Sequence, residues 1–248
     1  MRALLLPFAL ALFAAPLLSQ TAPTAQPAAD PEKELATLKS RYEDFGCLKC
    51  YGAEDAMLAP QAGRVVFFGD SITAVWGREV GTFFPGKPYV NRGISGQTTS
   101  QMLLRFQQDV VRLHPELVVI LAGTNDVAAN TGPMTPEMTE DNLTSMVELA
   151  AANHIRVVMA SVTPALDFPW RRGLNPAPKI RTLNAWIRSY AASHGLVYLD
   201  YYRALADADG GMKPGMSKEG VHPSEAGYAV MGPLAEKAVA EAMSRPKP

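Results

Sequence analysis

The sequence is poor in cysteine, histidine and charge, and each shortage removes a class of function. Its 248 residues include only two cysteines and four histidines. Cys47 and Cys50 have no histidine near them in sequence, so a structural zinc site would lack ligands. Charged residues make up 19% of the chain and the formal net charge is -1. Nucleic-acid partners are therefore not expected, because proteins that bind them usually carry a basic patch and a high pI.

The cysteine pair, in the order C-L-K-C, leaves several interpretations open. A structural disulfide or two idle thiols is the favoured interpretation. Metal binding is less favoured for lack of ligands. Redox catalysis is also less favoured, because the pair precedes the first predicted strand and lacks the βαβ context of a thioredoxin-like site.

Long apolar runs are absent after the N-terminus, so no stable membrane span is expected in the mature chain. The first residues show the order of a secretory signal: Arg2, an apolar run over Ala3–Leu18, and then small and polar residues. That run is short for a membrane span, which needs about 20 apolar residues. No cysteine lies near Ser19, so a lipid anchor is not expected. We predict a signal peptide over 1–22 and a periplasmic or secreted protein.

The rest of the chain divides into two predicted regions. Thr21–Pro31 is rich in Ala, Pro and Thr, which is typical of a flexible tether. Residues 23–60 are predicted to form this tether and an N-terminal helical extension, with a helix over Pro31–Phe45. Residues 61–245 are predicted to form the main folded domain.

Alternating strands and helices predict an α/β fold with a parallel sheet covered on both faces. Five short apolar runs predict buried strands at Arg64–Phe68, Tyr89–Asn91, Leu117–Leu121, Ile155–Ser161 and Val197–Asp200. Apolar residues at helical spacing predict helices at Thr98–Leu113, Thr135–Asn153, Lys179–His194 and Ser224–Met243. In such sheets ligands bind beyond the carboxyl ends of the strands, so reactive side chains are expected just after each apolar run.

Polar residues follow three of the predicted strands. Gly69-Asp70-Ser71 follows the first, and Ser71 there is placed to begin a helix, whose free N–H groups favour an anion. Helix capping by Asp70 or Ser71 is the alternative. Gly96 lies in a glycine-containing loop after the second strand, where a tight turn is the alternative. Asn125 follows the third strand and offers an amide donor, with an Asx turn as the alternative.

One histidine differs from the other three in its sequence context. His114, His154 and His194 each end a predicted helix, where the helix dipole and the open carbonyls explain a histidine. His222 lies in a loop before the last helix, three residues after Glu219. It is the best candidate for a general base, although a surface or structural role is the usual one for a lone loop histidine.

Taken together, these segments resemble the SGNH hydrolases, also called the GDSL esterase/lipase family. The resemblance runs from about Arg64 to the end of the last helix. It is carried by four blocks: Gly69–Ile72, Ile94–Gly96, Gly123–Asp126 and Glu219–His222. The resemblance implies a three-layer α/β/α sandwich with a flavodoxin-like, parallel, five-stranded sheet. It also implies ester hydrolysis through an acyl-enzyme, with no metal and no organic cofactor.

The resemblance also assigns roles to single residues. It places the nucleophile on Ser71 and the base on His222. The oxyanion donors are the backbone N–H groups of Ser71 and Gly96 and the side chain of Asn125. The chain departs from the family at Glu219, where an aspartate is usual. A glutamate can still accept from the imidazole, but its extra methylene changes its reach.

The substrate is expected to be a small-molecule ester. Thr163–Pro178 follows the fourth predicted strand and contains Trp170 and Arg171, which we predict to bind substrate at the rim of the site; a rigid surface loop is the alternative. Acetyl or short acyl esters, including those of carbohydrates, are favoured. A lysophospholipase or thioesterase activity and a non-catalytic binding protein are alternatives. No residue pattern assigns an oligomeric state.

Overall fold

The computed structural model describes residues 30–248. The predicted signal peptide at 1–22 and the start of the predicted tether lie outside the described residues. Helix α1 (Pro31–Glu43) is close to the helix predicted over 31–45, and the boundary between two compact units falls within it, after Lys39. The second unit, Ser40–Pro248, contains all the remaining elements. Between residues 30 and 248 the structure has no helix long and apolar enough to span a bilayer.

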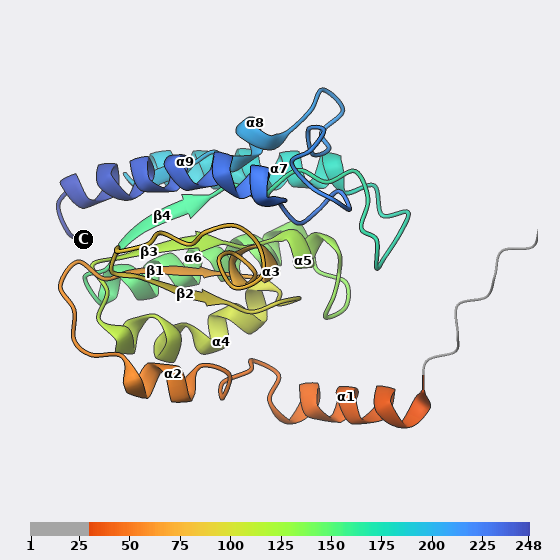
Figure 1. The fold of residues 1–248 in the computed structure, drawn as a ribbon, viewed down its shortest axis with the longest axis horizontal. Helices are drawn as coiled ribbons and strands as arrows, with labels where there is room; N and C mark the ends of the chain where they lie inside the picture. The colour runs from red at the N-terminus through yellow and green to blue at the C-terminus, as the bar shows by residue number, and fades with distance from the viewer. Residues whose placement is uncertain (1–29) are drawn as a thin grey trace, which may run out of the picture. The chain divides into compact units, whose positions relative to one another are not determined.

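Five parallel strands form one sheet, which confirms the predicted α/β architecture (Figure 1). Their bounds are β1 Val65–Gly69, β2 Tyr89–Gly93, β3 Leu117–Leu121, β4 Arg156–Ala160 and β5 Val197–Leu199. The strand order β2-β1-β3-β4-β5 is the flavodoxin-like order. Every residue of β1 and β3 is buried, which is why these strands read as unbroken apolar runs.

Helices connect the strands. Helices α1, already described, and α2 Gly52–Met57 precede the first strand. Four short helices lie in the connections that follow β1, β2, β3 and β5: α3 Ser71–Ala74, the 3₁₀ helix η1 Val111–Leu113, α5 Thr124–Val127 and α8 Tyr201–Leu205. Four long helices cover the sheet: α4 Thr99–Asp109, α6 Pro136–Ala152, α7 Pro176–Ser193 and α9 Glu225–Ser244.

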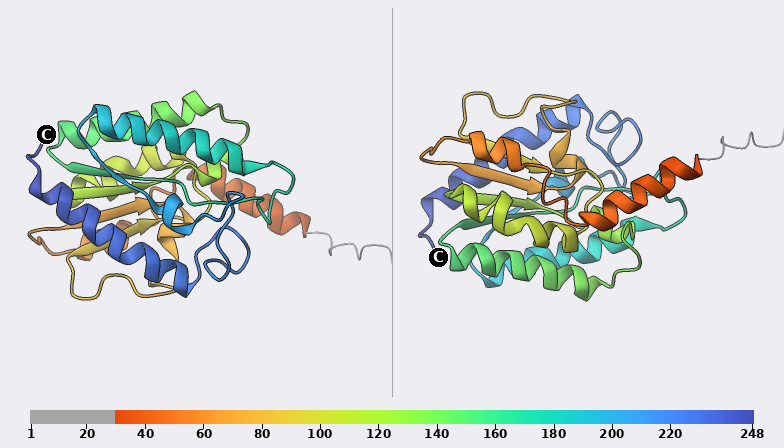
Figure 2. Two further views of the ribbon diagram at one scale, coloured as in Figure 1. Left: turned by 90° about the horizontal axis from the view of Figure 1, so that it is seen from above. Right: turned by 90° about the horizontal axis from the view of Figure 1, so that it is seen from below.

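Two apolar clusters lie on opposite faces of the sheet. On one face, Val66 and Phe68 of β1 belong to the cluster that includes residues of α4, α6 and α7. On the other face, Val65 and Phe67 belong to the cluster that includes residues of α9. Figure 2 shows α9 crossing one face, and α4 and α6 crossing the other. The fold is therefore the predicted three-layer sandwich.

Of the four helices predicted after the first strand, two differ from the structure by more than one residue at an end. The helix predicted over 98–113 ends at Asp109, because Val110 leaves the helical region (φ -125°, ψ -67°) and a 3₁₀ turn follows. The helix predicted to begin at Lys179 begins at Pro176. Proline is tolerated in a first helical turn, where its missing N–H would have no partner in the helix.

Candidate active site

A hydroxyl, an imidazole and a carboxylate lie in hydrogen-bonding contact beyond the carboxyl end of β1. The Ser71 Oγ lies 2.8 Å from the His222 Nε2. The His222 Nδ1 lies 2.7 Å from the Glu219 Oε1. Because a carboxylate only accepts hydrogen bonds, a neutral His222 carries its proton on Nδ1 and accepts the Ser71 hydroxyl proton at Nε2. Three side chains in this order can move a proton from the serine to the imidazole.

The end of β1 positions the serine. Gly69 is the last residue of β1, and Ser71 is the first residue of α3. A Cβ atom at Gly69 would lie 2.2 Å from the Thr73 Oγ1 and 2.8 Å from the Leu121 carbonyl oxygen. Only glycine therefore lets the chain turn from the strand into the helix at this point, against the end of β3.

Asp70 lies between the strand and the serine and is fully buried. Its Oδ1 accepts from the Ile72 backbone N–H at 3.0 Å, so it caps α3. Burial raises the pKa of this carboxyl group to about 6, although the Ile72 N–H and the charge of His222 act in the opposite direction. The capping role that the sequence left open thus belongs to Asp70, and the Ser71 hydroxyl contacts His222.

The loop that carries His222 is held by side-chain contacts to its own backbone. The Ser217 Oγ accepts from the Gly220 N–H at 2.9 Å. The Glu219 carboxylate accepts from two backbone N–H groups, that of Val221 at 3.1 Å and that of His222 at 2.6 Å. Glu219 therefore curls back over its own turn, and its extra methylene is accommodated while Oε1 contacts the imidazole.

The three predicted oxyanion donors follow three neighbouring strands: Ser71 begins α3 after β1, Gly96 lies in the loop after β2, and Asn125 lies in α5 after β3. The Asn125 Nδ2 donates to the Gln97 carbonyl at 3.0 Å and lies 3.4 Å from the Asp70 Oδ2. Its two acceptors thus belong to Gln97 and Asp70, which are the sequence neighbours of Gly96 and Ser71. The backbone N–H groups of Gly96 and Ser71 are the other two predicted donors. The Ser71 N–H is at the first position of α3 and has no acceptor within that helix. Gly96 adopts φ +79°, which favours glycine.

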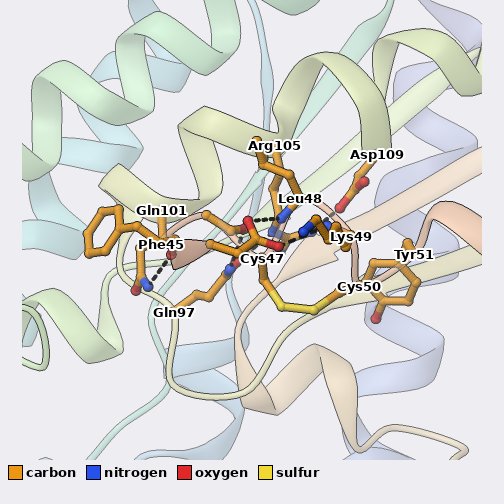
Figure 3. Close-up of a disulfide and its surroundings, with 12 residues drawn as sticks. Phe45, Cys47, Leu48, Lys49, Cys50, Tyr51, Gln97, Gln101, Arg105 and Asp109 are labelled. Atoms are coloured by element: carbon orange, nitrogen blue, oxygen red, sulfur yellow. Dashed lines mark hydrogen bonds and ion pairs between the residues drawn. A yellow bond between two sulfur atoms is a disulfide. The ribbon is translucent and has the colours of Figure 1, made fainter. Parts of the chain in front are cut away.

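A buried arginine supports the loop that contains Gly96. Arg105 of α4 is fully buried and donates to the Gln97 Oε1 at 2.5 Å, to the Gly69 carbonyl at 3.0 Å and to the Asp109 Oδ2 at 2.9 Å. Gln97 in turn donates to the Gly46 carbonyl at 3.0 Å. Figure 3 shows Gln97, Arg105 and Asp109 around the segment from Phe45 to Tyr51. One guanidinium group thus ties the end of β1 to the predicted oxyanion loop.

The two cysteines belong to that same segment. Cys47 and Cys50 form a disulfide, beside α4 in Figure 3. The Asp44 carboxylate accepts from the backbone N–H groups of Leu48, at 2.7 Å, and Lys49, at 3.1 Å. The disulfide therefore closes a turn whose backbone is held by a carboxylate, which is consistent with the structural interpretation of the cysteine pair.

The predicted substrate residues Trp170 and Arg171 lie differently. The Trp170 side chain is 45% exposed, is stacked on Phe168 with ring centroids 5.1 Å apart, and lies 6.1 Å from the His222 ring. The Arg171 Nη1 donates to the carbonyl of Ala128 at 2.8 Å and also to that of Ala129. The structure brings Trp170 next to His222, whereas the Arg171 guanidinium holds the chain that follows α5.

Several residues that contact the site were not predicted from the sequence. Gln97 directly follows Gly96, and its position next to a predicted oxyanion residue was the signal for its role in the site. Arg105 and Asp109 form a buried i,i+4 ion pair among apolar neighbours. Charged residues four apart on the apolar side of a predicted helix are unusual, and this was the signal in the sequence. Asn130 contacts Asn125 and Trp170, and nothing in the sequence links it to a residue 40 positions away.

Comparison with known proteins places the chain among ester hydrolases. Residues 67–230 match the GDSL-like Lipase/Acylhydrolase family. The crystal structure of a GDSL-like lipase from Bacteroides thetaiotaomicron is 45% identical with a TM-score of 0.77, over 80% of this chain and 99% of that one. An acetyl-xylooligosaccharide esterase from Geobacillus, solved as a mutant, is 19% identical with a TM-score of 0.59, over 72% of this chain and 94% of that one, and shares the fold.

A relative also exists among bacterial lipoproteins. YqeF, an uncharacterized lipoprotein of Bacillus subtilis, is 32% identical over 81 residues. The match covers 32% of this chain and 33% of YqeF, so it spans about a third of the length of that relative. Because YqeF is an uncharacterized lipoprotein, this match bears on where the protein is located and says little about its activity.

Proposed function

The chain belongs to the GDSL-like Lipase/Acylhydrolase family and is an ester-hydrolysing enzyme, and from that premise we propose that it is an exported serine esterase that cleaves acetyl or short acyl esters through an acyl-Ser71 intermediate. The observation that carries the proposal is the continuous hydrogen-bonded line from Ser71 through His222 to Glu219. The nucleophile, the base and the orienting acid are those three residues in that order.

In the first half of the reaction, the Ser71 Oγ attacks the ester carbonyl carbon while the His222 Nε2 takes its proton. The carbonyl oxygen becomes an oxyanion, which accepts from the Ser71 and Gly96 backbone N–H groups and from the Asn125 Nδ2. The second hydrogen on that nitrogen is available because its contact with Asp70 is long, at 3.4 Å. His222 then gives its proton to the leaving alcohol, and the acyl group remains on Ser71.

The second half of the reaction repeats these roles with water. His222 takes a proton from a water molecule, whose oxygen attacks the acyl carbon. The same three donors hold the second oxyanion. When the tetrahedral intermediate collapses, the carboxylic acid leaves and His222 returns a proton to the Ser71 Oγ. The Glu219 carboxylate stabilises the imidazolium that forms in both halves.

The preference for small acyl esters of carbohydrates is supported by Trp170. Its half-exposed ring lies beside His222 and is fixed from behind by Phe168. A flat aromatic surface of this kind suits the apolar face of a sugar ring. The Geobacillus esterase, which shares the fold, acts on acetylated xylo-oligosaccharides. Arg171 acts on the substrate indirectly, because its guanidinium nitrogen is committed to backbone carbonyls near Trp170.

Export is supported by three independent features. The N-terminal residues have the order of a secretory signal. The Cys47–Cys50 disulfide is typical of oxidising compartments. The relative in Bacillus subtilis is a lipoprotein, although this chain has no cysteine near Ser19 that could take a lipid. The mature enzyme is therefore proposed to be periplasmic or secreted.

A panel of para-nitrophenyl esters, from acetyl to long acyl, tests the proposed activity. We expect kcat/KM to be highest for the acetyl and short acyl esters. A serine-directed organophosphonate should abolish the hydrolysis and label one residue, Ser71, as read by mass spectrometry of the digested protein. A preference for long acyl chains would instead favour the lysophospholipase alternative, and a label on another residue would refute the assignment of the nucleophile.

We predict that Trp170→Ala raises KM for an acetylated xylo-oligosaccharide about fivefold, because a ring stacked on an aromatic surface contributes about 1 kcal/mol. KM for para-nitrophenyl acetate, which has no sugar to stack, should change less. Trp170→Phe keeps an aromatic ring and should lie between the two. Leu166→Ala, at a residue of the same segment that is 50% exposed, is the matched control. Equal effects on both substrates would return this segment to the role of a rigid surface loop.

A further inference from the structure

Asn130 is the residue at which the elements of the proposed site meet. It lies just after α5, five residues beyond Asn125. The Trp170 Nε1–H donates to its Oδ1 at 3.0 Å. Its Nδ2 donates to the Asn125 Oδ1 at 2.7 Å and to the Gly96 carbonyl at 3.3 Å. One amide side chain therefore contacts two predicted oxyanion residues and the proposed sugar platform.

These contacts fix which way each amide is turned. An indole N–H only donates, so the atom of Asn130 that faces Trp170 is its oxygen. A backbone carbonyl only accepts, so the atom that faces Gly96 is the Asn130 nitrogen. That nitrogen also faces Asn125, whose own oxygen must therefore be the atom turned toward Asn130. The Asn125 nitrogen is left on the opposite side, toward the Gln97 carbonyl and the Asp70 carboxylate.

The backbone around Asn130 is itself held in place. The Asn130 N–H donates to the Asn125 carbonyl at 3.0 Å. Arg171 donates to the carbonyls of the two preceding residues, and the Thr131 hydroxyl lies 3.2 Å from that of Thr98. Because this segment is fixed at three points, the Asn130 side chain keeps its orientation, and no reorganisation energy is spent on it during the reaction. This is the condition for a preorganised site.

We propose that Asn130 is a positioning residue that sets the amide orientation of Asn125, so that Asn125 presents its N–H rather than its carbonyl oxygen to the oxyanion. The inference rests on the proposed function, in which Asn125 is an oxyanion donor. Trp170 has a second role in it, because its indole N–H orients Asn130. In this chain of hydrogen bonds, Trp170 donates to Asn130, Asn130 donates to Asn125, and Asn125 donates to the oxyanion.

Isosteric replacement tests this orientation. In Asn130→Asp the carboxylate only accepts, so it draws the Asn125 N–H toward itself and turns the carbonyl oxygen of Asn125 toward Ser71. We expect kcat for para-nitrophenyl acetate to fall about 30–100-fold, since a lost oxyanion donor costs about 10²–10³-fold. Asn130→Ala removes the contact without attracting the N–H, and should cost only about 3–10-fold. KM should stay within about twofold in both variants, because the interaction is made in the transition state.

Asn125→Ala and the double variant Asn125→Ala/Asn130→Asp complete the experiment. If Asn130 acts through Asn125, the double variant should have the kcat of Asn125→Ala alone. Losses that multiply would overturn the inference, because the new carboxylate would then act on the oxyanion directly. So would a normal kcat in Asn130→Asp when Asn125→Ala is impaired. A normal kcat in Asn125→Ala would instead refute the oxyanion assignment in the proposed function.

A matched control separates these effects from a general effect of the substitution. Asn153 lies at the C-terminal end of α6, is exposed and donates to the Leu149 carbonyl. Asn153→Asp makes the same chemical change far from Ser71 in the sequence and outside the site loops, and it should leave kcat unchanged. Thermal unfolding midpoints of all the variants establish that the kcat values compare folded proteins.

Discussion

Replacing Ser71 with alanine is expected to lower kcat for ester hydrolysis by about 10⁴–10⁶-fold, since removal of the nucleophile leaves only the residual contribution of the oxyanion donors and of substrate binding. The loss is expected to be nearly complete because, among residues 30–248, no hydroxyl other than that of Ser71 contacts the His222 Nε2. The measurement is the turnover of para-nitrophenyl acetate by purified protein.

The Ser71→Ala protein should remain folded. The cap of α3 is the Asp70 carboxylate, which accepts from the Ile72 N–H and is not altered. The Ser71 hydroxyl contributes one hydrogen bond, to a partly exposed imidazole, so the unfolding midpoint should hardly change. Ser193→Ala, at an exposed serine near the end of α7, is the control for turnover. Wild-type turnover in a folded Ser71→Ala protein would exclude Ser71 as the nucleophile.

Glu219→Gln is expected to lower kcat by about 10²–10³-fold with little change in KM. Both carboxylate oxygens face donors, Oε1 toward the His222 Nδ1 and backbone N–H, and Oε2 toward the Val221 N–H. A glutamine must turn its NH₂ group toward one of these donors, and it also loses the charge that stabilises the imidazolium. The effect is smaller than for a buried triad acid, because the Glu219 side chain is 38% exposed.

Two further substitutions sharpen that prediction. Glu219→Asp should restore part or all of the lost rate, because aspartate is usual at this position in the family that the sequence resembles. Glu225→Gln, in the first turn of α9, makes the same change in charge outside the triad and should leave kcat unaltered. Nearly full activity in Glu219→Gln would mean that Ser71 and His222 act as a dyad.

The fold could be predicted because its strands are buried on both faces. Val65–Gly69 and Leu117–Leu121 are apolar throughout, and only a parallel sheet covered by helices on both sides buries such strands completely. The element bounds were less predictable. The break at Val110 depends on its backbone dihedrals, and α3 and α5, each of four residues, are too short to show a helical period.

The sequence could predict which residues follow each strand and so lie at the site. Ser71, Gly96 and Asn125 follow three successive strands, and the ends of parallel strands meet at one edge of a sheet. The contacts between loops could not be predicted in this way. Trp170 and Asn130 are joined by a hydrogen bond between segments 40 residues apart, and the two backbone contacts of Glu219 depend on how its side chain folds over its own turn.

The distance in sequence between the nucleophile and its base has a consequence for folding. The Ser71–His222 hydrogen bond joins residues 151 positions apart, so we expect it to form late in folding, after the strands have paired and the loop before α9 has docked. Contacts of such long range are made late, because the entropy of closing the chain must be overcome first. A refolding chain with native circular dichroism would still lack hydrolysis until that loop docks. Recovery of esterase activity therefore reports completion of the fold, whereas spectroscopic signals report its beginning.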